Sequence, residues 1–548
     1  MFFGPPPIAL LADMTSIPTP GIPRILHQTW HTFPVPIETG DTASWQRLNP
    51  RWQYQFWDDT ALRDFMAGQF PQLLQVYDGY AHPVQRADLA RYCLLKHFGG
   101  VYADVDTRCL QSLEPLAGDP RVILCEEPRD RQHHAHRRGL PALLFNGTMA
   151  SPAGHPLWDA VIDHCLRMSS RTTGHVLETT GPLILSAAVA QWAQPDEIAL
   201  HSSHLFAESD SDRCPPAERF GPFRDLCVSQ HFWQGSWFRE RPPHALKRAV
   251  TKLRKLRHRL RGRRPRLAAL RARMDETLLH REIPADERFP KVTILIPVRN
   301  GASTLARNLD AILGLDYPKN RIQIVYGEGD SSDETPEILK GLIARHAATF
   351  AGMRRLETRR NAPHFPHARR WRPAFQAKRR AGLARARNEL VRQVLADDSD
   401  WILWMDADVI GLPSDLLTAL LAVREKIVTP DCVLEPDGPS YDLNAFLDIG
   451  EPGEVEYMRH VRGGIFQPPV NYWARRHLDD LRYLDRVPLN GVGGTVLLVR
   501  ADLHRAGLLF PETPYRDLLE TEGLGQLARD LGIVPVGLPS VQVLHDRQ

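Results

Sequence analysis

Two pairs of aspartates, each separated by one residue, are the most informative chemical groups in this sequence. Asp104 and Asp106 follow the apolar start of VYADVD, and Asp406 and Asp408 follow that of WILWMDAD. Paired carboxylates at the end of a strand can hold a hard divalent cation. Such a cation offsets the charge that develops on a leaving diphosphate when a sugar nucleotide is cleaved. Because an unpaired buried carboxylate is costly, the apolar strand before each pair favours a metal site over a solvated turn.

The same order of elements is expected before both pairs. HPVQRADLARYCLLKHFGG predicts a helix that begins near Pro83 and ends at Gly99 and Gly100, followed by a strand. In the second half GLARARNELVRQVL predicts a helix, DDSD a turn and WILWMDADV a strand. KVTILIPVRN and RIQIVYGEGD predict further strands, so strands alternate with helices. This alternation is typical of α/β domains with a mostly parallel sheet, which bind ligands beyond the carboxyl ends of their strands.

The length of 548 residues indicates more than one domain. We expect an N-terminal tail over 1–20, a first domain over 21–240, a basic linker over 241–288 and a second domain over 289–548. In the linker, apolar residues recur every three or four positions among many Lys and Arg residues, namely Leu246, Val250, Leu253, Leu256 and Leu260. The linker is therefore interpreted either as a helix packed on one domain or as an interfacial helix at an anionic membrane. A nucleic-acid partner is not expected.

Composition predicts a protein with packed cores, since 43% of its residues are hydrophobic and 24% are charged. The seven cysteines form no closely spaced pair, which favours a reducing compartment. The first residues, MFFGPPPIALLADM, lack a basic start and contain three consecutive prolines, so they predict neither a signal peptide nor a membrane span. We expect a cytoplasmic protein whose only membrane contact is peripheral, on the inner face of the plasma membrane.

The first domain resembles the DxD sugar-binding glycosyltransferases that include the initiating α-1,6-mannosyltransferases. The resemblance rests on IPRILHQTW, NPRWQYQFWDD, RADLARYCLLKHFGGVYADVD, FNGTMASPAGHP, TTGP and HFWQGSW. It implies that Asp88 and Arg91 contact hydroxyls of the donor sugar. It also implies that Gln28 and Trp30 line the nucleotide pocket and that His231 approaches the metal. A core role for Trp30, a structural role for His231 and a surface ion pair for Asp88 and Arg91 are the alternatives.

The second domain resembles the fungal mannan-polymerase mannosyltransferase subunits. The matching segments are ILIPVRNGA, GDSSDET, RAGLARARNEL, DWILWMDADVI, YDLNAF, VPLNGVGGTVLLVRADLHRAG, ETEGLGQLARDLG and GLPSVQVLH. The resemblance implies a GT-A fold, GDP-mannose as donor, Mn²⁺ as the preferred cation over Mg²⁺ and retention of the α anomer. It implies that Pro297, Arg299 and Asp330 hold the nucleotide and that His545 completes the metal site. An imidazole ligand suits Mn²⁺ better than Mg²⁺.

Two further features of the second domain have less defined roles. Glu520 and Glu522 are expected on the acceptor side, with Glu522 as the candidate catalytic carboxylate, although no spacing rule assigns either one a step. The glycines of NGVGGT permit close approach of the ligand or shape a turn. No nucleophile is predicted, because a retaining transferase can use front-side attack steered by the leaving phosphate.

The sequence thus predicts a bifunctional, metal-dependent, retaining glycosyltransferase. Its donors are nucleotide sugars, and its acceptor is a glycan or a lipid-linked sugar in surface polysaccharide biosynthesis. The alternative is one catalytic domain beside a carbohydrate-binding or scaffolding domain. Nucleotidyl transfer is disfavoured, because neither IPRILHQTW nor ILIPVRNGA is a glycine-rich phosphate loop.

Overall fold

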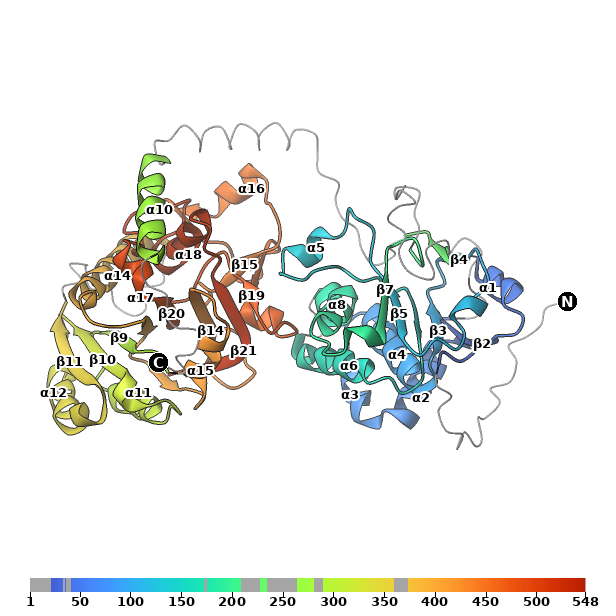
Figure 1. Cartoon of the computed structure of the whole chain (residues 1–548), viewed down its shortest axis with the longest axis horizontal. Helices are drawn as coiled ribbons and strands as arrows, with labels where there is room; N and C mark the ends of the chain where they lie inside the picture. The colour runs from blue at the N-terminus through green and yellow to red at the C-terminus, as the bar shows by residue number, and fades with distance from the viewer. Residues whose placement is uncertain are drawn as a thin grey trace. The chain divides into compact units, whose positions relative to one another are not determined.

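The computed structural model describes residues 21–32, 35, 41–171, 175–207, 227–233, 264–279, 289–358 and 373–547. The chain divides into two compact units, whose elements are labelled in Figure 1. The N-terminal unit comprises Met1–His136 and Leu140–Glu240, and the C-terminal unit comprises Arg137–Gly139 and Arg241–Gln548. Each unit has its own sheet and helices, so the expected α/β class is confirmed.

The N-terminal unit is built on a six-stranded sheet. The strand order is β2 (Gln53–Trp57), β1 (Ile25–Thr29), β3 (Gly100–Ala103), β6 (Thr148–Ser151), β5 (Val122–Cys125) and β7 (Ile198–His201). Strands β2 and β3 are parallel to β1, whereas β6 is antiparallel to both β3 and β5. Two short strands, β4 (Thr107–Cys109) and β8 (Ser229–His231), form a separate antiparallel pair. Because β7 is parallel to β5, every strand of this sheet except β6 runs in the same direction, so the expectation of a mostly parallel sheet is confirmed.

Helix α4 (Pro83–Phe98) confirms the predicted helix before the first aspartate pair. Pro83 lies in its first turn, and the helix stops at Gly99, whose φ is +65°. A Cβ at Gly100 would lie 2.3 Å from the carbonyl oxygen of Ile25, so glycine lets β3 approach β1. The other α-helices described in this unit are α1 (Thr42–Leu48), α2 (Asp59–Gln69), α3 (Leu74–Gly79), α5 (His133–His136), α6 (Leu157–Arg167), α7 (Val176–Thr179) and α8 (Pro182–Ala190).

The C-terminal unit is built on a nine-stranded sheet. The strand order is β11 (Gly352–Glu357), β10 (Ile322–Glu328), β9 (Val292–Val298), β12 (Trp401–Met405), β20 (Val496–Arg500), β14 (Ile427–Val433), β21 (Val536–His545) and β13 (Val409–Gly411), and β19 (Val487–Pro488) pairs with β21. Strand β20 is antiparallel to both β12 and β14. This sheet is mixed. Two-stranded ribbons join β15 (Phe446–Asp448) to β18 (Arg475–His477) and β16 (Val461–Arg462) to β17 (Ile465–Phe466).

Helices cover both faces of this larger sheet. Along β12, Leu403 and Met405 belong to one core cluster, and Ile402 and Trp404 belong to another. This alternation is expected because successive side chains of a strand point to opposite faces. The first cluster includes residues of α11 (Leu305–Leu313), α12 (Thr335–His346) and α15 (Leu416–Ala422). The second includes residues of α10 (Arg264–Leu279), α14 (Pro373–Val394), α17 (Ala501–Arg505) and α18 (Glu520–Asp530).

Only part of the predicted basic linker is described. Its apolar stripe, Leu246, Val250, Leu253, Leu256 and Leu260, lies outside the described residues. Helix α10 belongs to the described part, and its Leu270 and Met274 are buried in the second core cluster of the C-terminal unit. Arg271 Nη2 also donates a hydrogen bond to the carbonyl oxygen of Asp530 at 3.2 Å. This stretch therefore packs on a domain, whereas contact of the stripe with a membrane stays a prediction. Across the described residues, no helix combines the length and apolar character needed to cross a bilayer.

Candidate active sites

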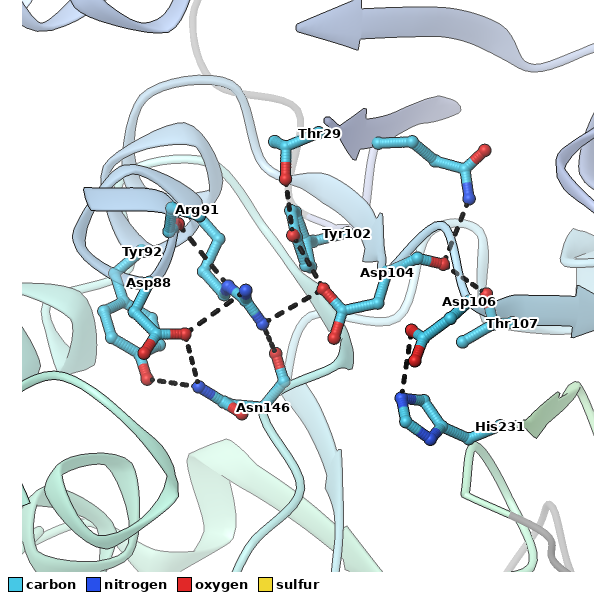
Figure 2. A network of polar contacts seen from close by, with 12 residues as sticks. Thr29, Asp88, Arg91, Tyr92, Tyr102, Asp104, Asp106, Thr107, Asn146 and His231 are labelled. Atoms are coloured by element: carbon cyan, nitrogen blue, oxygen red, sulfur yellow. Dashed lines mark hydrogen bonds and ion pairs between the residues drawn. The ribbon is translucent and has the colours of Figure 1, made fainter. Parts of the chain in front are cut away.

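The first aspartate pair meets a histidine that is distant in sequence. Asp104 and Asp106 lie between β3 and β4, and the antiparallel pairing of β4 with β8 places Thr107 opposite His231. This register brings His231 Nε2 to 3.2 Å from Asp106 Oδ1 (Figure 2). One potential ligand atom from each of the two aspartates and the histidine lies within 4.8 Å of the others. The structure thus brings together the three residues predicted for the first metal site.

The second aspartate pair has the same strand register, but among the described residues only the first pair and its histidine bring three potential ligand atoms within 4.8 Å of one another. Asp406 and Asp408 lie between β12 and β13, and the antiparallel pairing of β13 with β21 places Val409 opposite His545. His545 Nε2 lies 3.0 Å from Asp408 Oδ1. The late histidine predicted for this site therefore meets the second aspartate here as well.

A buried arginine from the preceding helix holds the first aspartate of each pair. In the N-terminal unit, Arg91 Nη1 on α4 lies 3.2 Å from Asp104 Oδ1. In the C-terminal unit, Arg387 Nη2 on α14 lies 2.8 Å from Asp406 Oδ1. Both arginines are at most 5% exposed. Arg387 was not predicted as a site residue, although it lies in the predicted helix before its aspartate pair, as Arg91 does.

Asp88 and Arg91 form a buried ion pair and not a surface pair. Arg91 Nη2 lies 3.2 Å from Asp88 Oδ1, which also accepts a hydrogen bond from Asn146 Nδ2 at 3.1 Å (Figure 2). The hydroxyl of Thr180 donates to Asp88 Oδ2 at 3.0 Å. Burial raises the pKa of Asp88 to about 6, even though Arg91 opposes the rise. Asn146 and Thr180 were not singled out as site residues, although they lie in the quoted segments FNGT and TTGP.

Gln28 and Trp30 lie at the end of β1, beside this site. Gln28 Nε2 donates to the carbonyl oxygen of Asp104 at 3.3 Å, and Gln28 Oε1 accepts from the hydroxyl of Tyr54 at 3.0 Å. The indole N–H of Trp30 is buried and finds no hydrogen-bond acceptor within the described residues. A buried donor of this kind normally has a partner. Gln28 is thus placed at the aspartate pair, and the role of Trp30 in the nucleotide pocket stays a prediction.

The predicted nucleotide-binding residues of the C-terminal unit meet at one edge of its sheet. Strand β9 is parallel to both β10 and β12, so the carboxyl ends of these strands lie together. Pro297 is opposite Gly327, and Arg299 Nε donates to the carbonyl oxygen of Asp330 at 3.1 Å. Asp330 has a φ of +57°, a conformation that residues other than glycine adopt rarely and that is enriched at functional sites. Since β12 runs into Asp406, these residues lie at the same sheet edge as the metal pair.

Glu520 and Glu522 face arginines within the unit and not the solvent. Glu522 Oε2 lies 2.7 Å from Arg380 Nη1, and Glu522 Oε1 lies 3.7 Å from Arg475 Nη1. Glu520 Oε1 lies 3.4 Å from Arg387 Nη1. Both glutamates are 5% exposed. They therefore neutralise buried guanidinium groups, and the predicted catalytic role of Glu522 gains no support from its position.

The glycines of NGVGGT make room for side chains of the site. A Cβ at Gly493 would lie 2.5 Å from Asp442 Oδ2, and a Cβ at Gly494 would lie 2.6 Å from Arg387 Nη1. Asp442 Oδ2 accepts hydrogen bonds from the backbone N–H groups of Gly494 at 2.8 Å and Thr495 at 3.1 Å. Asp442 was not predicted, although it lies in the quoted segment YDLNAF.

The charges at both aspartate pairs fit a divalent cation. In the N-terminal unit, Asp88 and Asp104 share the guanidinium of Arg91, and Asp106 lies against His231. Burial raises the pKa of Asp104, Arg91 opposes the rise, and Asp106 adds to it. Burial likewise raises the pKa of Asp406 to about 6. A cation near such carboxylates stabilises their ionised forms, so the residues present suit one.

The two histidines differ in how their second ring nitrogen is bound. His545 Nδ1 lies 2.7 Å from the carbonyl oxygen of Asp546, so Nδ1 carries a proton and donates it. His231 Nδ1 instead accepts the backbone N–H of Trp233 at 3.0 Å, which leaves the proton of a neutral ring on Nε2. The first arrangement leaves Nε2 suited to a metal, as in most metal-binding histidines. In the second arrangement Nε2 must lose its proton before it can bind a metal, and a proton on Nδ1 would break the hydrogen bond from Trp233.

The chain matches two families of sugar-transferring enzymes. The family model described as the glycosyltransferase sugar-binding region containing the DXD motif matches residues 38–123, and the Anp1 family model matches residues 273–514. Both resemblances seen in the sequence are thereby confirmed, with one family model matching in each part of the chain.

Known relatives of the chain include two proteins from Schizosaccharomyces pombe. Inositol phosphoceramide mannosyltransferase 3 is 34% identical over 185 residues, which cover 33% of this chain and 48% of the relative. Mannan polymerase complex subunit mnn9 is 29% identical over 275 residues, which cover 47% of this chain and 80% of the relative. The chain thus spans about half the length of the first of these relatives. The first of these relatives is named a mannosyltransferase and the second a mannan polymerase complex subunit, and the chain is similar to both in sequence.

Among solved structures, a mannosyltransferase from Pyrobaculum calidifontis in complex with GDP-Man and Mn²⁺ is 19% identical, with a TM-score of 0.29. The likeness covers 51% of this chain and 64% of that chain. A TM-score this low supports no conclusion about the chain.

Proposed function

We propose that the chain is a bifunctional, metal-dependent, retaining glycosyltransferase with one active site in each unit. The observation that supports this most strongly is the repeated arrangement of two aspartates, a late histidine and a buried arginine. Each arrangement lies at the end of a sheet strand, where α/β folds bind their ligands. Two such arrangements within two unrelated families argue for two working sites.

Asp104, Asp106 and His231 would hold a cation in the N-terminal unit, and Asp406, Asp408 and His545 would hold one in the C-terminal unit. A bound Mn²⁺ or Mg²⁺ would stabilise the charge that develops on the leaving diphosphate. Arg91 and Arg387 keep one oxygen of the first aspartate occupied, so the other oxygen points in a fixed direction. Such preorganisation is what a site built on rigid elements provides.

The proposed donor of the C-terminal unit is GDP-mannose, bound with Mn²⁺ on a GT-A fold. The mannosyl transfer named for the relatives supports this choice, as does the position of Arg299 and Asp330 beside Asp406. The donor of the N-terminal unit is a nucleotide sugar of unassigned type. The proposed acceptor is a glycan or a lipid-linked sugar, in keeping with the mannan and inositol phosphoceramide of the relatives' names.

Calorimetry on the full chain tests this proposal. GDP-mannose should bind more tightly with Mn²⁺ than without it, and Asp408→Asn should remove this difference, because it removes an anionic ligand. Equal GDP-mannose affinity with and without Mn²⁺ in the wild-type chain would refute the metal-dependent C-terminal site. If the Asp104→Ala, Asp106→Ala double variant has no effect on any transfer activity, the N-terminal unit is instead a binding or scaffolding module.

A further inference from the structure

Trp473 of the C-terminal unit is a large aromatic side chain without a role in either candidate active site, and it is 53% exposed. We propose that Trp473 and Asp448 form a subsite for a neutral pyranose of the acceptor glycan. The inference rests on the proposed function, since it assigns the acceptor side of the C-terminal site. It also answers a question that the buried Glu520 and Glu522 leave open, namely which groups on that side can reach a substrate.

Trp473 is fixed in place although half of it faces solvent. Its indole N–H donates a hydrogen bond to Glu456 on α16 (Glu454–Arg459). Its ring lies against Gly450, where a Cβ would stand 2.4 Å from ring atom Cζ3. A ring held on two sides loses little freedom when a ligand stacks on it, so more of the contact energy appears as affinity. Tryptophan is also the aromatic residue that most often anchors binding surfaces.

Asp448 lies on a short ribbon whose second strand begins just after Trp473. Strand β15 pairs antiparallel with β18, which places Asp448 opposite Arg475, two residues after Trp473. Arg475 Nε lies 3.2 Å from Asp448 Oδ1, yet 38% of the Asp448 side chain stays exposed. An ionised carboxylate makes strong hydrogen bonds to hydroxyl groups, and this one is held in one direction by the guanidinium. The fixed ring and the fixed carboxylate therefore come from adjoining segments, because Trp473 lies two residues before Arg475 and its ring lies against Gly450, two residues after Asp448.

This pairing matches the chemistry of a pyranose. A sugar ring offers apolar C–H groups on its faces and hydroxyl groups around its edge. The C–H face can pack on the indole while an edge hydroxyl donates to the carboxylate. Specific sites commonly combine an apolar surface with a few placed polar groups in this way.

The surface is connected to the metal pair through the unit's interior. A continuous series of buried ion pairs runs inward from Asp448 through Arg475, Glu522, Arg380, Glu520 and Arg387 to Asp406. The chain itself limits the separation. Asp448 follows Asp442 by six residues, which span at most about 20 Å, and Asp442 binds the N–H of Thr495, whose carbonyl accepts the N–H of Asp406 at 2.9 Å. A short oligosaccharide bound at Trp473 can therefore extend towards the donor site.

A membrane is a less suitable occupant of this surface. Exposed Val455, Met458 and Val470 occur in the same part of the chain. The exposed charged residues there have both signs: Glu451 and Glu454 are acidic, and Arg459 and Arg462 are basic. Anionic bilayers attract a clear excess of basic residues, which this segment lacks.

The test uses the full chain, Mn²⁺, GDP and α-1,6-linked mannotriose as the probe. Trp473→Ala should weaken mannotriose binding in calorimetry by about tenfold or more, because a central aromatic anchor commonly contributes that much. Trp473→Phe should retain part of the affinity, and Asp448→Asn should weaken binding without abolishing it. The KM for GDP-mannose should not change in any of these variants. Trp192→Ala is the matched control, because Trp192 also donates its indole N–H to a glutamate, Glu197, at 3.3 Å in the N-terminal unit.

Failure of this inference can be separated from failure of the proposed function. If the wild-type chain binds GDP-mannose with Mn²⁺, but mannotriose binds equally to wild type and Trp473→Ala, only the subsite is refuted. Failure of wild type to bind millimolar mannotriose would refute it too. A Trp473-dependent blue shift of fluorescence on phosphatidylcholine vesicles, without any change on mannotriose, would assign the surface to lipid instead. If Trp473→Ala lowers the melting temperature of the C-terminal unit, the mannotriose affinities of Trp473→Phe and Asp448→Asn test the subsite instead.

Discussion

The two candidate sites share a backbone register although they belong to different families. In each unit, the residue after the second aspartate is opposite the histidine of a late strand. In each, the residue after that histidine donates its N–H to the carbonyl of the second aspartate, from Phe232 to Asp106 at 3.0 Å and from Asp546 to Asp408 at 2.8 Å. The first aspartate also donates its N–H to a residue just before the antiparallel neighbour strand, Gly147 or Thr495. The same backbone scaffold thus presents both carboxylate pairs.

The sites differ in the groups that surround this scaffold. Arg91 has Asp88 as its second partner, whereas Arg387 has Glu520. Nδ1 of His545 donates to a carbonyl, whereas Nδ1 of His231 accepts an N–H. The comparison indicates that the strand register fixes where a cation would bind. The groups that contact the arginine and the histidine would then decide how tightly each site binds it. Each prediction below tests one part of this comparison.

The largest expected effect concerns the independence of the two sites. Replacing Asp406 and Asp408 by Ala should lower transfer by the C-terminal unit on the order of a thousandfold or more, because stabilisation of the diphosphate charge is lost. Replacing Asp104 and Asp106 should do the same to the N-terminal unit alone. Mass spectrometry with a separate acceptor for each unit measures both activities. If either double variant silences both activities while melting stays cooperative, the two-site comparison fails and a composite site must be considered.

The next effect concerns the two buried arginines, whose replacement should lower the free energy of unfolding. Arg387→Met leaves Asp406 and Glu520 without their buried partner, which should cost about 3–5 kcal/mol of unfolding free energy. Arg91→Met should have a similar effect through Asp88 and Asp104. Urea unfolding, followed by separate probes for each unit, measures the loss. Arg63→Met is the control, because the Arg63–Asp78 pair is exposed and should contribute little. A loss below 1 kcal/mol for both buried arginines would contradict the role assigned to them.

A smaller effect separates the two histidines. His545→Gln should weaken Mn²⁺ binding to the C-terminal site by about tenfold to a hundredfold, since a ligand with a well-placed outer partner is lost. His231→Gln should weaken Mn²⁺ binding to the N-terminal site by less, because Nε2 of His231 must first lose its proton. Electron paramagnetic resonance of Mn²⁺, with the other site removed by its double alanine variant, measures each affinity. Equal losses would show that the Trp233 N–H does not restrain His231.

Much of each site follows from local sequence, and the rest depends on pairing between distant segments. Helix α4, its glycine end and both strand-end aspartate pairs were predictable, because periodicity and turn residues are local signals. The antiparallel strands β6 and β20 beside the aspartate strands were not, because strand direction depends on partners far along the chain. The burial of Glu520, Glu522 and Arg387 was also hidden, since charged side chains on a helix usually face water. Only the tertiary packing of α14 against α18 shows that these charges satisfy one another.

The last expected effect concerns pH and Asp88, and it holds only without divalent cations. The folded protein binds a proton on Asp88 more tightly than the unfolded chain does, because burial raises its pKa to about 6 from 3.8. The resulting stability is fully present below about pH 4 and is lost as pH rises through about 6. Without divalent cations, the unfolding free energy of the N-terminal unit should therefore fall between pH 4 and pH 6, by up to about 3 kcal/mol for a rise of this size, and the urea midpoint should fall with it. Asp88→Asn should flatten this fall, because its amide cannot titrate. Asp78→Asn is the control: Arg63 lowers the pKa of Asp78, so any effect of this exposed group lies below pH 4. A fall of the same size in Asp88→Asn and wild type would show that other buried acids of the unit, and not Asp88, distinguish its pH response from that of the C-terminal unit.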